Sequence, residues 1–335
     1  MNAAELQQEL FQVIKSNIPD HLSTTEEIAK VLDVSVDSVY RRMRGEKTIS
    51  LDELHLLCSH YKISLDQLMR IETGSFLFQG NLQNEKTFRY EAYLNSILTN
   101  VLYFNSFAEK EYYHLGKDVD IYHHFLFRDI AAFKYFFWTK TIFNSPRLGN
   151  IQFNFDVYTD EMWETAKKIL AGCNQLPTVE IWNVENINVA IRQIEFYRDG
   201  RIFETDKDAL RLYEAWEKVI DHIEKQAERG YKFIYGDPEM KPISEYKVYF
   251  NEVILGDNSK LVILNGVKVA IILHTTNNYM MTRDLNFTEN LYQHLQSIMQ
   301  RSTLISTVSE KERSKFFRTL RERIARRKDA LKVSA

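Results

Sequence analysis

Apolar residues recur at helical spacing through the first seventy residues of the chain. They predict one helix over residues 4–16 and four more that each begin at a serine or threonine, near positions 23, 35, 50 and 64. Hydroxyl side chains are good N-caps, and Gly45 can take the left-handed conformation that ends the third helix. The pattern therefore predicts a five-helix domain over residues 1–72.

The pattern changes after this domain. Residues 73–86 contain two glycines and two asparagines and predict a linker. Aromatic residues then become dense from Tyr90 to Phe143, with one long buried helix expected at the end of that run, and helical periodicity continues to Gly230. Residues 87–240 are therefore predicted to form a helical domain, built as a stack of antiparallel helix pairs.

Short runs rich in Val, Ile and Tyr follow in residues 241–335. Asn265 and Gly266 separate two of these runs and predict a tight hairpin, because both positions tolerate positive φ. We expect a small antiparallel sheet of three or four strands, then two helices, of which the last is basic. This α+β segment is either a unit of its own or one unit with residues 87–240. The predicted fold class is multidomain and mainly α.

The composition favours long helices in a globular protein, because only five prolines and eleven glycines occur in 335 residues. Cys58 and Cys173 both lie in apolar surroundings, which predicts free thiols in a reducing compartment. The chain contains no run of 18 apolar residues, which is the minimum that would predict a membrane span. We therefore expect a cytoplasmic protein that does not contact a membrane.

The formal net charge of -3 does not indicate a polyanionic partner, but two segments are locally basic. The first places Arg41, Arg42, Arg44 and Lys47 within seven positions. The second spans residues 310–332, where ten lysines and arginines face four acids along an amphipathic helix. Three roles are open for this second helix: docking on the sheet, a dimer contact, or added affinity for phosphates.

No motif predicts catalysis. The chain lacks a Gly-rich phosphate loop ending in Lys-Ser or Lys-Thr, and it lacks G-x-S-x-G, H-E-x-x-H and C-x-x-C. His123 and His124 point about 100° apart on a helix, so they do not form the i, i+4 pair of a helical zinc site. We expect no enzyme activity, no metal and no cofactor. An enzyme hidden in residues 87–335 would need a concave cluster of titratable side chains.

The aromatic run from Tyr122 to Trp138 has two interpretations. One is a helical core packed with Phe and Trp, and the other is an apolar pocket for a small-molecule or peptide effector. Both use the same residues, so the sequence leaves both open.

The stretch TTEEIAKVLDVSVDSVYRRMRGEKTISLDELHLLCSHYKISLDQLM resembles the lambda-repressor-like helix-turn-helix of Cro/CI (XRE-type) regulators. The segment DSVYRRMRGEK is similar to the BetR-type variant of this motif. EEIAKVL corresponds to the supporting helix, DVS to the turn and SVDSVYRRMRG to the recognition helix. The resemblance covers about a fifth of the chain and implies double-stranded DNA as the partner.

The resemblance also implies roles for individual residues. In this fold the recognition helix lies in the major groove, which assigns base contacts to Val36, Asp37, Ser38 and Arg41. Phosphate contacts are implied for Thr24, Thr25, Arg42, Arg44 and Lys47. Val39 and Met43 would belong to the core. Two departures stand out: threonines and Glu26 replace the glutamine that often starts the supporting helix, and Asp37 would place a carboxylate against the duplex.

We therefore expect a sequence-specific transcriptional regulator whose recognition helix spans residues 35–44. Dimerisation is expected because one such module makes a small interface, and the C-terminal region would dimerise or sense a small molecule or peptide. The alternative is a protein-interaction scaffold that uses the helix-turn-helix fold without specific DNA binding. The sequence does not reveal the operator or the sign of regulation.

Overall fold

The N-terminal domain is a compact group of five helices. The computed structural model describes residues 2–19, 21–69, 76–80, 83–253 and 258–334. The helices of this domain are α1 (Ala3–Ser16), α2 (Thr24–Leu32), α3 (Val36–Met43), α4 (Leu51–Tyr61) and α5 (Leu65–Leu68). All five contribute apolar residues to one core, which includes Ile14, Ile28, Val39 and Leu57 at 0 % exposure. The predicted five-helix domain is confirmed.

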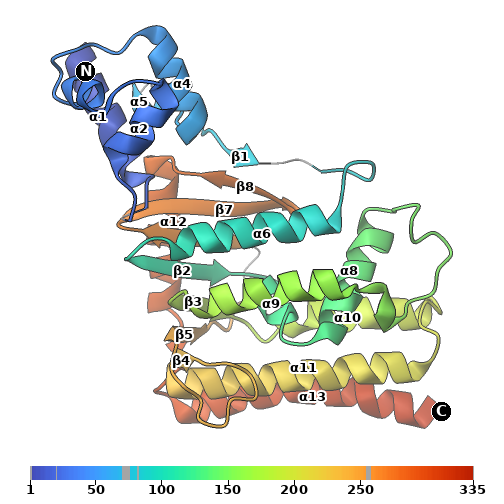
Figure 1. Ribbon diagram of the computed structural model, residues 1–335. Helices are drawn as coiled ribbons and strands as arrows, with labels where there is room; N and C mark the ends of the chain where they lie inside the picture. Colours follow the sequence, from blue (N-terminus) through green and yellow to red (C-terminus); the bar gives the residue numbers. More distant parts are fainter. Residues whose placement is uncertain (1, 20, 70–75, 81–82, 254–257, 335) are drawn as a thin grey trace.

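The rest of the chain is built around one mixed sheet, which lies below the N-terminal domain in Figure 1. Its described strands run in the order β1-β8-β7-β6-β2-β3-β5-β4, and β9 also pairs with β5. They are β1 (Gln79–Gly80), β2 (Lys110–Leu115), β3 (Thr178–Trp182), β4 (Tyr231–Lys232), β5 (Ser244–Phe250), β6 (Ser259–Leu264), β7 (Val267–Thr275), β8 (Asn278–Thr282) and β9 (Thr303–Leu304). The neighbours β2, β3 and β5 are parallel, and the other pairs are antiparallel.

Two expectations about this region are wrong. Residues 87–240 are not purely helical, because they supply β2, β3 and β4. The sheet is not a small antiparallel one confined to residues 241–335, because β3 lies between β2 and β5 in parallel register. Residues 87–240 and 241–335 therefore share one sheet. The hairpin at Asn265 and Gly266 is present between β6 and β7, with φ of 46° and 83° at the two residues.

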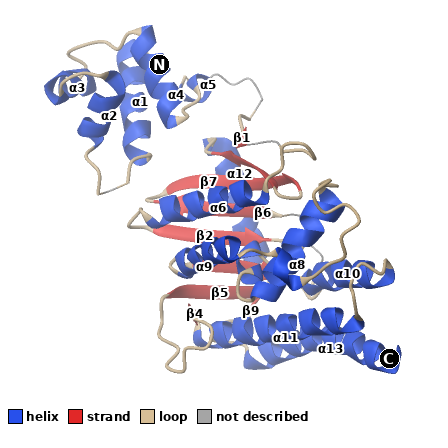
Figure 2. Ribbon diagram, turned by 45° about the vertical axis from the view of Figure 1, so that its right-hand side comes forward, coloured by secondary structure: helices blue, strands red, loops and turns tan. Residues whose placement is uncertain are grey.

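Helices cover both faces of the sheet (Figures 1 and 2). On one face lie α6 (Tyr90–Asn105), α9 (Asp160–Asn174) and α11 (Asp206–Arg229), and on the other lies α12 (Leu285–Gln300). The predicted long aromatic helix is broken at Phe125–Phe127 into α7 (Ile121–His124) and α8 (Arg128–Phe137). Most of the aromatic side chains of this run are buried in the main core beside α10 (Asn186–Asp199).

The basic C-terminal helix α13 (Glu310–Ser334) lies antiparallel beside α11 (Figure 1). Phe317, Leu320 and Ile324 are fully buried. The cations of α13 meet acids of α10, α11 and the residue before α10, in the pairs Arg321–Asp221, Arg321–Glu224, Arg323–Glu185, Arg327–Glu195 and Lys328–Glu217. Much of its positive charge is therefore compensated within the chain.

Where the structure describes it, the segment predicted as a linker packs on the α/β body, the part of the chain that comprises residues 83–253 and 258–334. Residues 73–75 and 81–82 lie outside the described residues. β1 pairs with β8 and forms one edge of the sheet, and the rings of Phe76 and Phe78 stand edge-on to Phe287. Asn17, just after α1, accepts hydrogen bonds from Arg283 and from the Tyr103 hydroxyl. The two domains are thus in contact at the edge of the sheet.

Candidate nucleic-acid interface

The turn between α2 and α3 is fixed by local backbone chemistry. Asp33 ends α2 in the left-handed conformation with φ of 51°, and Ser35 caps α3 by accepting a hydrogen bond from the Ser38 amide at 3.3 Å. Val39 anchors α3 in the core, where it is fully buried with Ile28 of α2. The sequence thereby produces two short helices joined by a tight turn.

The outer face of α3 is defined by its exposed side chains. At 100° per residue, Val36, Asp37, Tyr40, Arg41 and Arg44 fall within one exposed stripe, whereas Val39 and Arg42 fall on the buried side. Figure 2 shows α3 on the outer side of the domain, away from β1 and the sheet. A large partner can therefore reach this face.

The family comparison agrees with this geometry. Residues 8–82 match the BetR domain. BetR is a helix-turn-helix DNA-binding domain family, as the sequence of the first seventy residues implied. A comparison with curated proteins and one with solved structures each gave no match.

Three of the four predicted base contacts are exposed. Val36 has 38 % exposure, and the side chain of Arg41 has 54 %. Asp37 is exposed beside them. Ser38 is different, because its hydroxyl accepts a hydrogen bond from Arg42 Nη1 at 2.5 Å and its side chain is only half exposed. The hydroxyl of Ser38 is thus engaged by Arg42 within the domain, and its contact with a base stays a prediction.

Arg42 is not available for a phosphate, contrary to the expectation. It is 1 % exposed, and its guanidinium is fully engaged inside the domain. Nη1 donates to the Ser38 carbonyl at 2.9 Å, Nε donates to Glu53 Oε2 at 3.2 Å, and Nη2 forms an ion pair with Glu53 Oε1. Arg42 thus ties α3 to the first turn of α4.

The other cations remain on the surface. Arg44 Nε donates to Glu46 Oε1 at 2.7 Å, and Arg41 Nε lies 3.7 Å from Glu46 Oε2. The hydrogen bond from Arg44 lowers the pKa of Glu46. Lys47 is exposed in the same loop. Since exposed ion pairs of this kind are weak, both arginines can exchange Glu46 for a phosphate or a base.

The two threonines of α2 do not share one environment. Thr24 is half-buried, whereas Thr25 is 8 % exposed and its hydroxyl lies 3.2 Å from that of Ser23. Burial therefore removes Thr25 as a phosphate contact. Thr24 keeps part of its surface at the start of α2.

Two residues that shape this face of the domain were not singled out from the sequence. Tyr40 has 47 % exposure and lies on the outer face of α3. Gln7 of α1 holds the loop after α3: its Nε2 donates to the carbonyls of Arg42 at 2.7 Å and Lys47 at 2.9 Å, and its Oε1 accepts from the Ile49 amide at 2.9 Å. Counting positions around α3 would have found Tyr40, but no local signal indicates the role of Gln7.

The α/β body holds a buried polar cluster of its own. Glu180 of β3 accepts hydrogen bonds from His123 at 2.9 Å, from the Trp182 indole at 2.6 Å and from the Tyr246 hydroxyl at 2.8 Å. Burial alone would raise the pKa of Glu180, but His123 outweighs it and lowers that pKa to about 2. Lys232 donates to the Cys173 carbonyl at 2.9 Å and to the Thr178 hydroxyl at 2.7 Å. Glu180 and Lys232 are therefore each engaged by their own partners within the protein.

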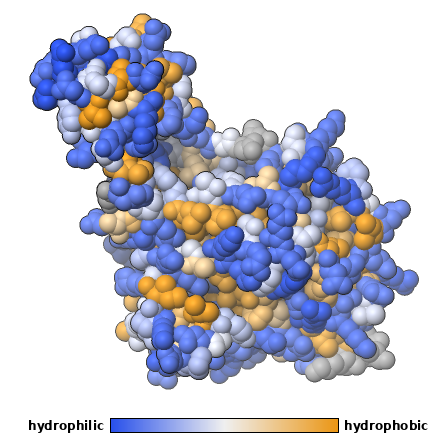
Figure 3. Space-filling view, in the orientation of Figure 1, coloured by the Kyte–Doolittle hydropathy of each residue, from blue (hydrophilic) through white to orange (hydrophobic). Residues whose placement is uncertain are grey.

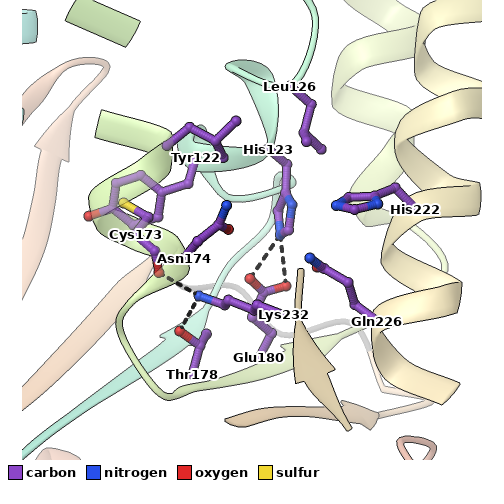
Figure 4. A pocket seen from close by; sticks show the side chains of 11 residues that line it. Tyr122, His123, Leu126, Cys173, Asn174, Thr178, Glu180, His222, Gln226 and Lys232 are labelled. Atoms are coloured by element: carbon purple, nitrogen blue, oxygen red, sulfur yellow. Dashed lines mark hydrogen bonds and ion pairs between the residues drawn. The ribbon is translucent and has the colours of Figure 1, made fainter. Parts of the chain in front are cut away.

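A small cavity lies beside this cluster, between α7, α9 and α11 (Figure 4). Its volume is about 20 Å³, and His123, Glu180, His222 and Lys232 are among its lining residues. A cavity of this size holds one water-sized group, far less than a metabolite requires. Among the residues that the structure describes, no three His, Cys, Asp or Glu side chains are grouped to hold a metal ion. Within the described ranges, no helix is both long and apolar enough to cross a bilayer.

The buried histidine beside the cavity predicts a loss of stability in mild acid. Burial lowers the pKa of His222 to about 4 from 6.5, and His123 and Lys225 add to the effect while the Phe233 carbonyl opposes it. A group whose pKa is lower in the folded state contributes stability above its unfolded pKa and loses it as the pH falls. We expect protonation of His222 to lower the free energy of unfolding of the α/β body by about 2 kcal/mol between pH 7 and pH 5.

Urea unfolding followed by tryptophan fluorescence will check this expectation, because all four tryptophans lie in the body. His114 and His124 are buried and have lowered pKa values too, so the contribution of His222 is the difference between the parent chain and His222→Gln. His294→Gln, at an exposed position on α12, is the matched control. Equal pH dependence in the parent and His222→Gln would contradict the prediction.

Proposed function

We propose that this chain is a sequence-specific DNA-binding transcriptional regulator that acts as a homodimer and works by binding rather than by catalysis. The observation that carries the proposal is the exposed face of α3, with Arg41 and Arg44 beside Lys47 in a domain that matches the BetR family. Arginine is well suited to reading guanine, and cations at the end of the helix suit phosphates.

The proposed roles divide along the stripe. Arg41 reads a base edge, and Arg44 and Lys47 hold the phosphate backbone, with Thr24 at the start of α2 as a further backbone contact. Dimerisation follows from the small area that one such module buries, since two half-sites one helical turn apart multiply specificity. The α/β body would supply the dimer contact.

We further propose that the body receives the regulatory signal, from a small molecule or a peptide. The contacts of β1 with β8 and of Asn17 with Arg283 support this, because a change at that edge of the sheet reaches the BetR domain directly. The pairing of Glu180 with His123 and Tyr246, and of Lys232 with the Cys173 carbonyl and the Thr178 hydroxyl, supports binding over catalysis, because these groups are already engaged within the protein.

Selection of random duplexes by the full-length chain tests the proposal, and Arg41→Ala and Arg44→Ala assign the roles. We expect Arg41→Ala to cost roughly 1–3 kcal/mol and to relax the sequence preference at one position. Arg44→Ala should weaken binding to all sequences alike and lower the slope of log affinity against log salt by about one.

Lys168→Ala is the matched control, because it removes one exposed positive charge from α9 of the body. It should leave affinity and salt dependence unchanged. If no consensus emerges, or if both arginine variants bind like the parent chain, DNA recognition through α3 is wrong and the scaffold alternative gains support.

A further inference from the structure

An apolar pair lies on one edge of the exposed stripe of α3. Val36 and Tyr40 are four residues apart, so their side chains are neighbours on the helix surface, with 38 % and 47 % exposure. Asp37 and Arg41 form the opposite edge of the same stripe, about 100° around the helix. The face thus presents an apolar half and a charged half.

The surroundings of this pair indicate what it contacts. Apolar side chains also reach the surface elsewhere on the N-terminal domain, among hydrophilic ones (Figure 3). Val36 and Tyr40 differ from those because Arg41 and Arg44 lie within the same exposed stripe of α3, where both are next to Glu46. A polyanion drawn to these cations is brought against the apolar pair.

We propose that Val36 and Tyr40 read the C5-methyl group of a thymine in the major groove. This inference rests on the proposed DNA-binding function. The thymine methyl is the apolar group that the major-groove edges of the four bases present, and side chains recognise it by apolar contact rather than by hydrogen bonds. Arg41, next to Tyr40, then reads a guanine at a neighbouring base pair, so the half-site holds a thymine and a guanine close together.

The test replaces each thymine of a selected duplex, one at a time, by uracil. Uracil lacks the methyl group and keeps every hydrogen bond, so the change isolates the apolar contact. We expect one position at which affinity falls about fourfold, equivalent to about 0.8 kcal/mol for one buried carbon group. 5-Bromouracil, whose bromine has about the size of a methyl group, should restore the affinity at that position.

Variants of the pair connect the effect to the protein. With Val36→Ser or Tyr40→Ser we expect the thymine-to-uracil ratio to fall toward one at that position, whereas Tyr40→Phe should keep it. Leu56→Ser is the matched control, because it removes an apolar side chain of 48 % exposure from α4 and should leave the ratio at fourfold. Far-UV circular dichroism melting of each variant checks that the domain is folded.

The possible outcomes distinguish a failure of the proposed DNA binding from a failure of the methyl contact alone. If the chain selects no duplex, both the proposed function and this inference fall. If it selects a consensus but no thymine responds to uracil, the methyl contact alone is overturned and DNA binding stands. If Tyr40→Phe weakens binding to all duplexes alike and no thymine responds, Tyr40 contacts a phosphate through its hydroxyl, which also overturns the inference.

Discussion

Replacement of Arg42 by methionine is expected to destabilise the BetR domain by roughly 2–3 kcal/mol, because it removes charge-assisted hydrogen bonds from a buried group. Methionine keeps much of the aliphatic volume of the side chain. It removes the guanidinium donor from the Ser38 carbonyl and hydroxyl and leaves Glu53 without its ion pair. For a domain of about 70 residues this corresponds to a melting temperature lower by roughly 10–20 °C.

The measurement uses the distribution of tryptophan in the chain. No tryptophan precedes Trp138, so a far-UV circular dichroism transition without a fluorescence change reports the BetR domain. Arg44→Met is the matched control, since the Arg44 side chain is 55 % exposed. We expect it to weaken DNA binding and to leave the melting temperature unchanged. If Arg42→Met instead melts like the parent chain and loses only phosphate affinity, the structural role of Arg42 is wrong.

Acid should act on the same contact. Hydrogen bonding from Arg42 lowers the pKa of Glu53, with the Ser50 amide and Lys47 contributing in the same direction. A carboxyl group whose folded pKa is lowered stabilises the fold above its unfolded pKa and loses that contribution as the pH falls. The difference in stability between the parent and Arg42→Met should therefore shrink as the pH falls below the usual range of a glutamate.

The BetR domain was the part of the chain that the sequence predicted best. Its helices are amphipathic, each has a capping residue, and the turn signals lie between them, so local patterns specify the fold. The individual roles of its arginines were harder to predict. The sequence around Arg41, Arg42 and Arg44 does not show which of the three is buried. Arg42 is buried because it pairs with Glu53, which lies on another helix.

The sheet shows where local patterns fail. β2 and β3 are central parallel strands, which usually read as continuous apolar runs. These two carry His114 and Glu180 on a buried face instead, at 4 % and 3 % exposure. Glu180 is satisfied by residues distant in the sequence, His123 and Tyr246. His114 and Glu180 interrupt the apolar run of each strand, so the sequence predicted helices alone for this region.

Glu180→Ala is expected to be the most destabilising of the substitutions considered, with a loss of roughly 3–5 kcal/mol from the body. The carboxylate is acceptor to His123, Trp182 and Tyr246 at once, and alanine leaves all three buried donors without it. Urea unfolding followed by tryptophan fluorescence measures the loss. Glu204→Ala, at an exposed position before α11, should unfold like the parent chain.

The pH dependence distinguishes a lost ion from lost packing. Since the pKa of Glu180 is lowered to about 2 from 4.5, its contribution is complete above pH 4.5 and disappears as the pH falls toward 2. The gap between the parent chain and Glu180→Ala should therefore close in that range if the charge is what stabilises the body. A gap of constant size down to pH 2 would mean that the side chain acts through its volume, and the ionic account of the cluster would be wrong.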